Sequence, residues 1–231
     1  AGQQVRVPPF RETPGTGAAA GIAGSGGGAP ATQAAADLDL LYEDAELVAA
    51  LKPAGLCSHA GTRHSDSVAD RLKAHFAGSA FVPVLAHRLD KDTSGILLAA
   101  RSYASLRRLN ELFASGGVKK TYLAWVDGVW TGETWPAGAP QLLEDSLERL
   151  ELAAGEVAGR RKVLAAKDGE GKAARSEVSV LLRKRSATLL MVRLRTGRTH
   201  QIRVQLATRG HAVISDAVYG RKVRGLPMLL H

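Results

Sequence analysis

The sequence predicts an α/β protein of the α+β type, with a mixed, largely antiparallel sheet flanked by helices. Strand-like and helix-like segments alternate irregularly along the chain, whereas a doubly wound parallel sheet requires regular alternation. Residues 178–182 and 189–194 read as an antiparallel hairpin joined by a short basic turn. Hydrophobic residues make up 45% of the 231 positions, which is enough for the core of one ordinary domain.

Residues 1–36 are expected to be a disordered segment rich in glycine and alanine, and residues 37–231 to form the folded domain. The first segment contains the run Gly24-Ser25-Gly26-Gly27-Gly28-Ala29-Pro30. Glycine loses the most entropy on ordering, and alanine buries little area in return, so this composition does not support a packed core.

The folded part is expected to open with two short strands around an acidic turn, within residues 40–51. A helix then follows, for which Ser65 or Asp66 can serve as the N-cap. Its apolar face recurs at four-residue steps, at Val68, Leu72 and Phe76. After a polar loop, residues 96–100 form an apolar run typical of a buried strand.

A second helix is predicted to begin at the cap Ser102 and to end at Gly116-Gly117. Its expected inner face holds Tyr103, Leu106, Leu109 and Phe113. A strand is expected over residues 118–126, because hydrophobic positions alternate there. Residues 127–172 lack a clear pattern and are interpreted as a long variable excursion. The last helix is predicted over residues 199–209.

The net charge of +9 and the pI near 10.0 favour a polyanionic partner, with nucleic acid as the first candidate and a membrane surface as the second. The single cysteine, Cys57, excludes an intramolecular disulfide and a zinc site built on several thiolates, and fits a reducing compartment. No apolar run reaches the roughly 18 residues of a membrane span. The first residues contain arginine and few acids, as in the remnant of an organellar transit peptide. The compartment stays open between the cytoplasm and an organelle, mitochondrion or plastid.

The polar loop before residues 96–100 places a carboxylate between basic side chains, in the run His87-Arg88-Leu89-Asp90-Lys91-Asp92-Thr93-Ser94-Gly95. Such a loop is a good place for a nucleophile or an acid–base group. A carboxylate shielded from water costs several kcal/mol unless a cation compensates. We therefore expect an arginine partner for Asp90 from elsewhere in the chain.

This loop resembles the catalytic loop of the RluA-type pseudouridine synthases, in which the aspartate after His-Arg-Leu attacks a uridine in RNA. Two further segments are similar to motifs of that family, in the expected order. Lys120-Thr121-Tyr122 is similar to Lys-x-Tyr, and residues 196–203 are similar to Thr-Gly-Arg-Thr-His-Gln-Ile-Arg. The resemblance runs from about Leu38 to the end of the chain and implies the pseudouridine synthase fold.

The resemblance also implies roles for individual residues. Asp90, Tyr122 and Arg203 would be catalytic: the nucleophile, the aromatic side chain against the target base, and the arginine that pairs with Asp90. A bidentate arginine suits a carboxylate because its fork matches the two oxygens. The substrate-binding residues would be Arg88, which fills the space left by the extruded base, Ile202, which closes the other side of the pocket, and His87, Lys120, Arg198 and His200.

Without the resemblance, a threonine-capped helix with basic side chains in its first turn could bind phosphate through its backbone N–H groups. Arg198 and His200 would contribute to that contact. Both interpretations lead to RNA, either ribosomal or transfer RNA. The protein is expected to be a monomer without membrane or metal partners.

The implied chemistry is an isomerisation that uses no cofactor and no metal. Asp90 would promote cleavage of the N-glycosidic bond, either by attack at the sugar or by removal of a ribose proton. The detached uracil would rotate and rejoin through a ring carbon. The sequence holds no cluster of cysteine and histidine ligands and no glycine-rich phosphate loop.

Three positions depart from the family pattern: Gln205 stands where histidine is usual, Ala212 where proline is, and Ser215 where glycine is. Family members also continue beyond Leu-His into further strands, so C-terminal strands are expected to be missing here. One alternative is a catalytically silent RNA-binding protein on the same scaffold. A protein kinase, which shares His-Arg-x-Asp, is excluded by the absence of an Asp-Phe-Gly and of a glycine-rich nucleotide loop.

Overall fold

The computed structural model describes residues 38–61, 66–132, 134–150, 162–165 and 171–231. The chain divides into two units, Ala1–Ala34 and Ala35–His231, and every described residue belongs to the second. The predicted disorder of residues 1–36 lies outside the described residues. Within these ranges, no helix is both long and apolar enough to cross a membrane.

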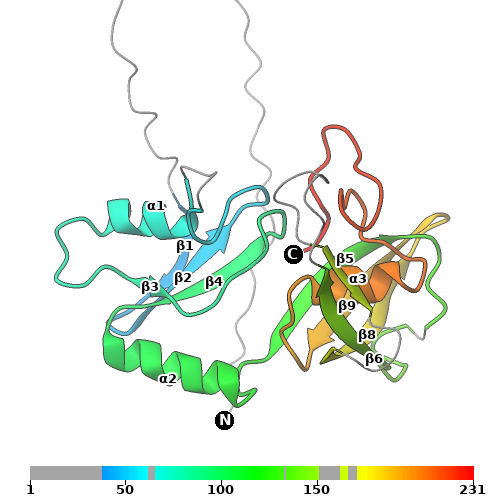
Figure 1. The fold of residues 1–231 in the computed structure, drawn as a ribbon, viewed down its shortest axis with the longest axis horizontal. Coiled ribbons are helices and arrows are strands. Elements are labelled where there is room, and N and C mark those ends of the chain that lie inside the picture. The colour runs from blue at the N-terminus through cyan, green and yellow to red at the C-terminus, as the bar shows by residue number, and fades with distance from the viewer. Residues whose placement is uncertain (1–37, 62–65, 133, 151–161, 166–170) are drawn as a thin grey trace, which may run out of the picture. The chain divides into compact units, whose positions relative to one another are not determined.

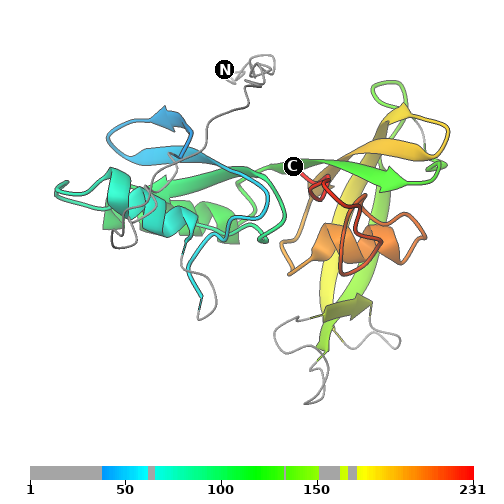
Figure 2. The same cartoon turned by 90° about the horizontal axis from the view of Figure 1, so that it is seen from above.

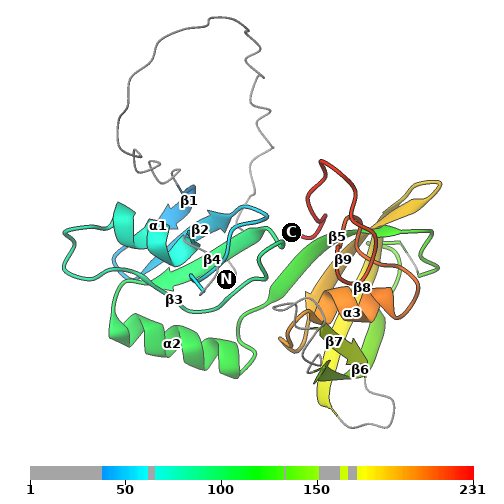
Figure 3. The same cartoon turned by 45° about the horizontal axis from the view of Figure 1, so that its top comes forward.

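The first sheet has the strand order β1-β2-β4-β3, and each neighbouring pair is antiparallel. Two helices, α1 and α2, accompany it (Figures 1 and 3). The two predicted strands around an acidic turn are confirmed, because the Asp44 carboxylate accepts the N–H groups of Glu46 and Leu47 between them. The bounds are β1 Leu40–Glu43, β2 Leu47–Lys52, α1 Val68–His75, β3 Val84–Leu85, β4 Gly95–Ala100 and α2 Tyr103–Ala114.

The helix α1 buries Val68 and Leu72 against the strands of this sheet, as the four-residue spacing predicted. Its N-cap is Ser67, so the prediction of Ser65 or Asp66 was wrong. The Ser67 hydroxyl accepts the N–H of Asp70, as a helix cap requires. Asp66 is instead paired with Arg71.

The helix α2 begins at the predicted cap, because the Ser102 hydroxyl accepts the N–H of Ser105. Its predicted inner face is partly wrong. Only Leu109 is buried among the helix residues, and the Tyr103 side chain at the first position is 74% exposed. Tyr103 packs its edge against Phe81 near the surface instead of entering the core.

The second sheet has the order β5-β9-β8-β6-β7, again with antiparallel neighbours. The predicted hairpin is confirmed as β8 and β9. Residues 127–172 were wrongly interpreted as an unpatterned excursion, because β6 and β7 lie there. The long strands of this sheet can be followed in Figure 2. The bounds are β5 Lys120–Asp127, β6 Gln141–Leu150, β7 Lys162–Ala165, β8 Lys172–Arg183 and β9 Ala187–Leu194.

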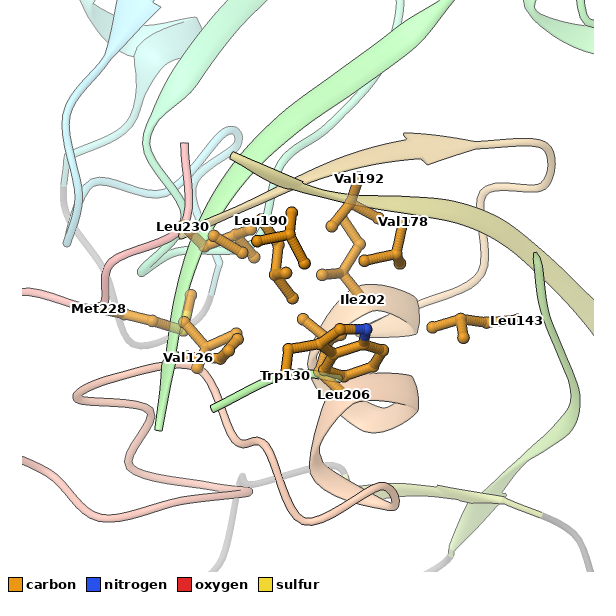
Figure 4. Packing of buried hydrophobic residues seen from close by; sticks show 13 residues of the cluster. Val126, Trp130, Leu143, Val178, Leu190, Val192, Ile202, Leu206, Met228 and Leu230 are labelled. Atoms are coloured by element: carbon orange, nitrogen blue, oxygen red, sulfur yellow. The ribbon is translucent and has the colours of Figure 1, made fainter. Parts of the chain in front are cut away.

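The fold class is therefore α+β with antiparallel strands, as predicted, but the strands form two sheets instead of one. One helix, α3 (Gln201–Ala207), packs on the second sheet and directs Ile202 and Leu206 into its core (Figure 4). This helix is shorter than the predicted span 199–209. His200 immediately before it has a left-handed φ of 54°, which ends the helical geometry there.

The segment 229–231 runs along the edge of β5 opposite β9. Leu123 and His231 exchange two backbone hydrogen bonds, and Trp125 N–H donates to Leu229. The same segment meets the loop before β4, because Ser94 N–H donates to the Leu230 carbonyl over 3.1 Å. The loop that carries Asp90 is thus tied to the second sheet.

Candidate active site

A buried lysine fixes the loop that carries Asp90. Lys52 ends β2 with 0% of its surface exposed. Its ammonium donates to the carbonyls of Pro53, Leu56 and Lys91 over 3.0, 2.7 and 2.8 Å. Because Lys91 follows Asp90 directly, this contact fixes the backbone next to the carboxylate. Sequence analysis gave Lys52 no role, since a lysine is rarely buried.

Replacing Lys52 with methionine is expected to lower the free energy of unfolding by about 1–3 kcal/mol at pH 7, because buried carbonyls lose their donor. Burial lowers the pKa of Lys52 to about 8 from 10.5. Between about pH 8 and pH 10.5 the unfolded chain therefore binds more protons than the folded protein. The free energy of unfolding of the wild type rises with pH over this range. Urea unfolding at pH 7 and pH 10 should show a larger gap between the two proteins at pH 10. Lys73→Met, at an exposed position of α1, should change stability by less than about 0.5 kcal/mol.

One arginine lies between two carboxylates. The Arg203 side chain, on α3, is 5% exposed. Its Nη1 lies 3.2 Å from Oδ2 of Asp90. Its Nε and Nη2 lie 2.7 and 2.8 Å from the two carboxylate oxygens of Asp216, which has no exposed surface. The structure thus brings Asp90 and Arg203 together across 113 positions of sequence.

The fork of the arginine faces Asp216, so the expectation of a bidentate pair with Asp90 was wrong. Burial acts to raise the pKa of Asp216, but hydrogen bonding to Arg203 and its charge outweigh that effect and lower the pKa below its ordinary value. Asp216 also accepts the N–H groups of Val218 and Tyr219. Asp90 receives a single N–H from Arg203 and keeps other lone pairs available for a substrate.

All nine residues singled out from the sequence line one cleft of about 400 Å³. Tyr122, on β5, forms part of its wall and packs against the cores of both sheets. Burial, followed by the negative charge of Asp90, raises the pKa of Tyr122, so its hydroxyl stays protonated. Ile202 is 5% exposed and also lines the cleft. The cleft therefore combines apolar walls with the Asp90 carboxylate.

The two histidines of the cleft have different environments. Burial, and then the charge of Lys120, lowers the pKa of His87 to about 4. Its Nε2 accepts the Leu98 N–H, so only the other ring nitrogen is available to a ligand. His200 places Nε2 at 3.7 Å from Oδ2 of Asp90 and Nδ1 at 2.7 Å from the Tyr219 hydroxyl. The prediction of a threonine cap at α3 was wrong, since His200 occupies the N-cap position without a side-chain hydrogen bond to the helix.

The remaining predicted residues supply positive charge to the cleft. Arg88 and Arg198 are exposed, and Lys120 is partly buried. The Arg198 Nε donates to the Ala173 carbonyl, which orients its guanidinium. A cleft lined by these three cations suits a polyanionic ligand such as an RNA backbone.

Three residues of this site had no predicted role: Lys52, Asp216 and Tyr219. Ser215, before Asp216, has a φ of 66°, a conformation that favours the glycine usual at this position. The Ser215 hydroxyl donates to the Leu226 carbonyl over 2.7 Å, which supports the strained backbone beside Asp216. The family resemblance of the C-terminal part of the chain, from which Ala212 and Ser215 depart, was the only sequence signal for this part of the site.

Two antiparallel sheets hold an ion-paired carboxylate in a basic cleft, an arrangement that suits a protein of the class that binds polyanions. A family model described as RNA pseudouridylate synthase matches residues 46–208. The chain belongs to this family.

Several curated relatives are similar over most of the chain. Ribosomal large subunit pseudouridine synthase C of Escherichia coli (strain K12) is 36% identical over 222 residues, which cover 95% of this chain and 63% of that protein. Ribosomal large subunit pseudouridine synthase D of Zymomonas mobilis is 33% identical over 203 residues, 84% of this chain and 59% of that protein. The chain thus spans about three-fifths of the length of these relatives.

Solved structures show the same fold. Human RNA Pseudouridylate Synthase Domain Containing 1 superposes with a TM-score of 0.69 at 22% identity, over 87% of this chain and 78% of that one. Human RNA Pseudouridylate Synthase Domain Containing 4 gives 0.63 at 22% identity, over 83% and 81%. The pseudouridine synthase fold predicted from the motifs is thereby confirmed.

Proposed function

We propose that this protein is an RNA pseudouridine synthase, an isomerase that converts specific uridines of structured RNA. The observation that carries the proposal is the placement of Asp90, held by one N–H of Arg203 in a cleft walled by Tyr122 and Ile202. A carboxylate of this kind is ion-paired, oriented and accessible, as a nucleophile or base must be. Because the matched relatives are named for the large ribosomal subunit, ribosomal RNA is the first substrate class, and transfer RNA the second.

The target uridine must leave its helix before it reaches Asp90, at a cost of a few kcal/mol. Stacking on Tyr122 and phosphate contacts of Arg198 and Lys120 offset this cost. Arg88 is exposed on the loop next to Asp90, where its long side chain can occupy the position that the base vacates.

The reaction then proceeds without a change in oxidation state. Asp90 either attacks C1′ of the ribose or removes the proton at C2′, and the N-glycosidic electron pair leaves with the uracil. The uracil rotates in the cleft, and its C5 bonds to C1′. C5 then loses its proton to solvent and N1, freed from the sugar, takes one up. The Asp90 carboxylate is regenerated when C5 displaces it from C1′ or, on the other route, when it returns the proton to C2′. Arg203 stabilises the carboxylate throughout, and the protonated Tyr122 holds the ring.

The test is release of tritium from large-subunit ribosomal RNA transcribed with [5-³H]uridine. We expect the purified protein to release label in step with the pseudouridine found in the RNA by nucleoside analysis. RNA labelled at C6 serves as the control and should retain its label, because only the C5 proton is exchanged for a bond to the sugar. If the protein binds ribosomal RNA but releases tritium neither from it nor from a labelled transfer RNA pool, it is a catalytically silent RNA-binding protein.

A further inference from the structure

We propose that Tyr219 holds His200 as the tautomer with its proton on Nε2, and that this N–H donates to the ribose hydroxyl of the target uridine beside Asp90. The tautomer follows from contacts within the protein. The assignment of the ribose hydroxyl as the acceptor rests on the proposed function. Tyr219 is then a positioning residue, which acts through His200.

The first argument is the hydrogen bonding of the Tyr219 hydroxyl. Its oxygen accepts the N–H of Val163, on β7, over 2.9 Å, and lies 2.7 Å from Nδ1 of His200. Within the described part of the chain these are its only hydrogen bonds. If Nδ1 carried the proton, the oxygen would accept twice and its own O–H would have no acceptor. If Tyr219 donates to Nδ1, both the Tyr219 O–H and the Nδ1 lone pair have a partner. The proton of the imidazole is then on Nε2.

The second argument is the charge that Nε2 faces. Oδ2 of Asp90 lies 3.7 Å away, and a lone pair on Nε2 at that distance would repel it. An N–H there is attractive. Burial, the largest influence, lowers the pKa of His200, although the charge of Asp90 opposes it, so the neutral ring is favoured. Both ring nitrogens thus select the same tautomer.

The ring is also held in orientation by its surroundings. Tyr219 is fixed at its backbone, since its N–H donates to the Asp216 carboxylate. The guanidinium of Arg203 lies over its ring at 5.1 Å. The ring of His200 meets that of Tyr219 edge-on, with centroids 5.5 Å apart. The ion-paired Arg203 and Asp216 therefore place Tyr219, and Tyr219 places His200.

The distance to Asp90 leaves the N–H available for a third atom. At 3.7 Å it exceeds the range of an N–H···O hydrogen bond, which ends near 3.2 Å. Attack at C1′ and removal of the C2′ proton both bring the Asp90 oxygen against the ribose. The 2′-oxygen, bonded to C2′, is an acceptor next to that position on either route. A donor to the 2′-hydroxyl would also distinguish RNA from DNA.

The experiment uses the full chain labelled with ¹⁵N-histidine, at pH 7 and without RNA. We expect the ring nitrogens of His200, identified by the loss of their signals in His200→Asn, to report a neutral ring with the proton on Nε2. In Tyr219→Phe we expect a mixture of the two tautomers, and about a tenfold lower kcat/KM for tritium release. Tyr103→Phe, which removes an exposed hydroxyl on α2, should leave the His200 signals and kcat/KM unchanged.

The acceptor is tested by titrating the same sample with uridine 5′-monophosphate and 2′-deoxyuridine 5′-monophosphate. We expect the Nε2 signal to move with the ribonucleotide and to move little with the deoxynucleotide. Equal shifts, or none with either, would overturn the ribose assignment. A proton on Nδ1, a doubly protonated ring, or an unchanged tautomer in Tyr219→Phe would overturn the role of Tyr219. The tautomer is read without turnover, so its failure is distinct from a failure of tritium release.

Discussion

Asp90→Asn is expected to lower tritium release by at least about 10³-fold, which corresponds to about 4 kcal/mol of transition-state stabilisation. The amide has nearly the shape of the carboxylate but is a poor nucleophile and a poor base. Either route, attack at C1′ or removal of the C2′ proton, fails for the same reason. Arg203 keeps its bidentate partner Asp216, so the protein should remain folded.

The matched control for this substitution is Asp92→Asn, two positions away in the same loop. Asp92 is exposed, and it does not line the cleft. The change removes the same charge, so the general electrostatic effect on RNA binding should be the same in both variants. Activity of Asp92→Asn should stay within about threefold of wild type, within the scatter of a surface substitution. Comparable losses in both variants would show that Asp90 acts only through its charge.

Asp216→Ala is expected to lower the free energy of unfolding by about 3–5 kcal/mol, because it leaves a buried guanidinium without its bidentate partner. The N–H groups of Val218 and Tyr219 lose their acceptor as well. Since Arg203 holds the pKa of Asp216 below its ordinary 3.8, the contribution of the carboxylate is present above that pH and is lost as the pH falls further. Urea unfolding at pH 7 and at pH 3 should therefore show a smaller difference from wild type at pH 3.

Glu43→Ala is the comparison for that measurement. Glu43 pairs with Arg101 over 2.7 Å, but both side chains are substantially exposed, at 40% and 28%. Such a pair contributes about 0–1 kcal/mol. If the two substitutions cost the same, burial of the Arg203 pair has no special effect on stability. Arg203→Met combined with Asp216→Leu should recover part of the loss, because no unpaired charge is left in the core.

Several local features of the fold could be predicted from the sequence, but the pairing of distant strands could not. The Ser102 cap and the burial of Val68 and Leu72 were predicted correctly. Both features depend on residues only three or four positions apart. The strand β6 was missed because residues 127–172 are rich in glycine, alanine and charge and show no clear hydrophobic alternation. Its partner β8 begins more than twenty residues later, and nothing local predicts that pairing. The division into two sheets has the same origin.

The candidate site, too, could be predicted from the sequence only in part. The motifs identified Asp90, Tyr122 and Arg203, and the structure brings all three to one cleft. They could not show which carboxylate takes the fork of Arg203, since Asp90 and Asp216 offer the same chemistry and only geometry separates them. The role of Lys52 could not be predicted, because its burial depends on three carbonyls that only the folded loop brings together.

The guanidinium shared by Asp90 and Asp216 has a consequence for natural variation. A change at one acid alters the charge experienced by the other, because both depend on the same cation. Under the proposed function, exchanging these three side chains one at a time is expected to pass through a form that is either poorly folded or inactive. Positions 90, 203 and 216 should therefore be inherited as a unit, even where the surrounding surface diverges freely.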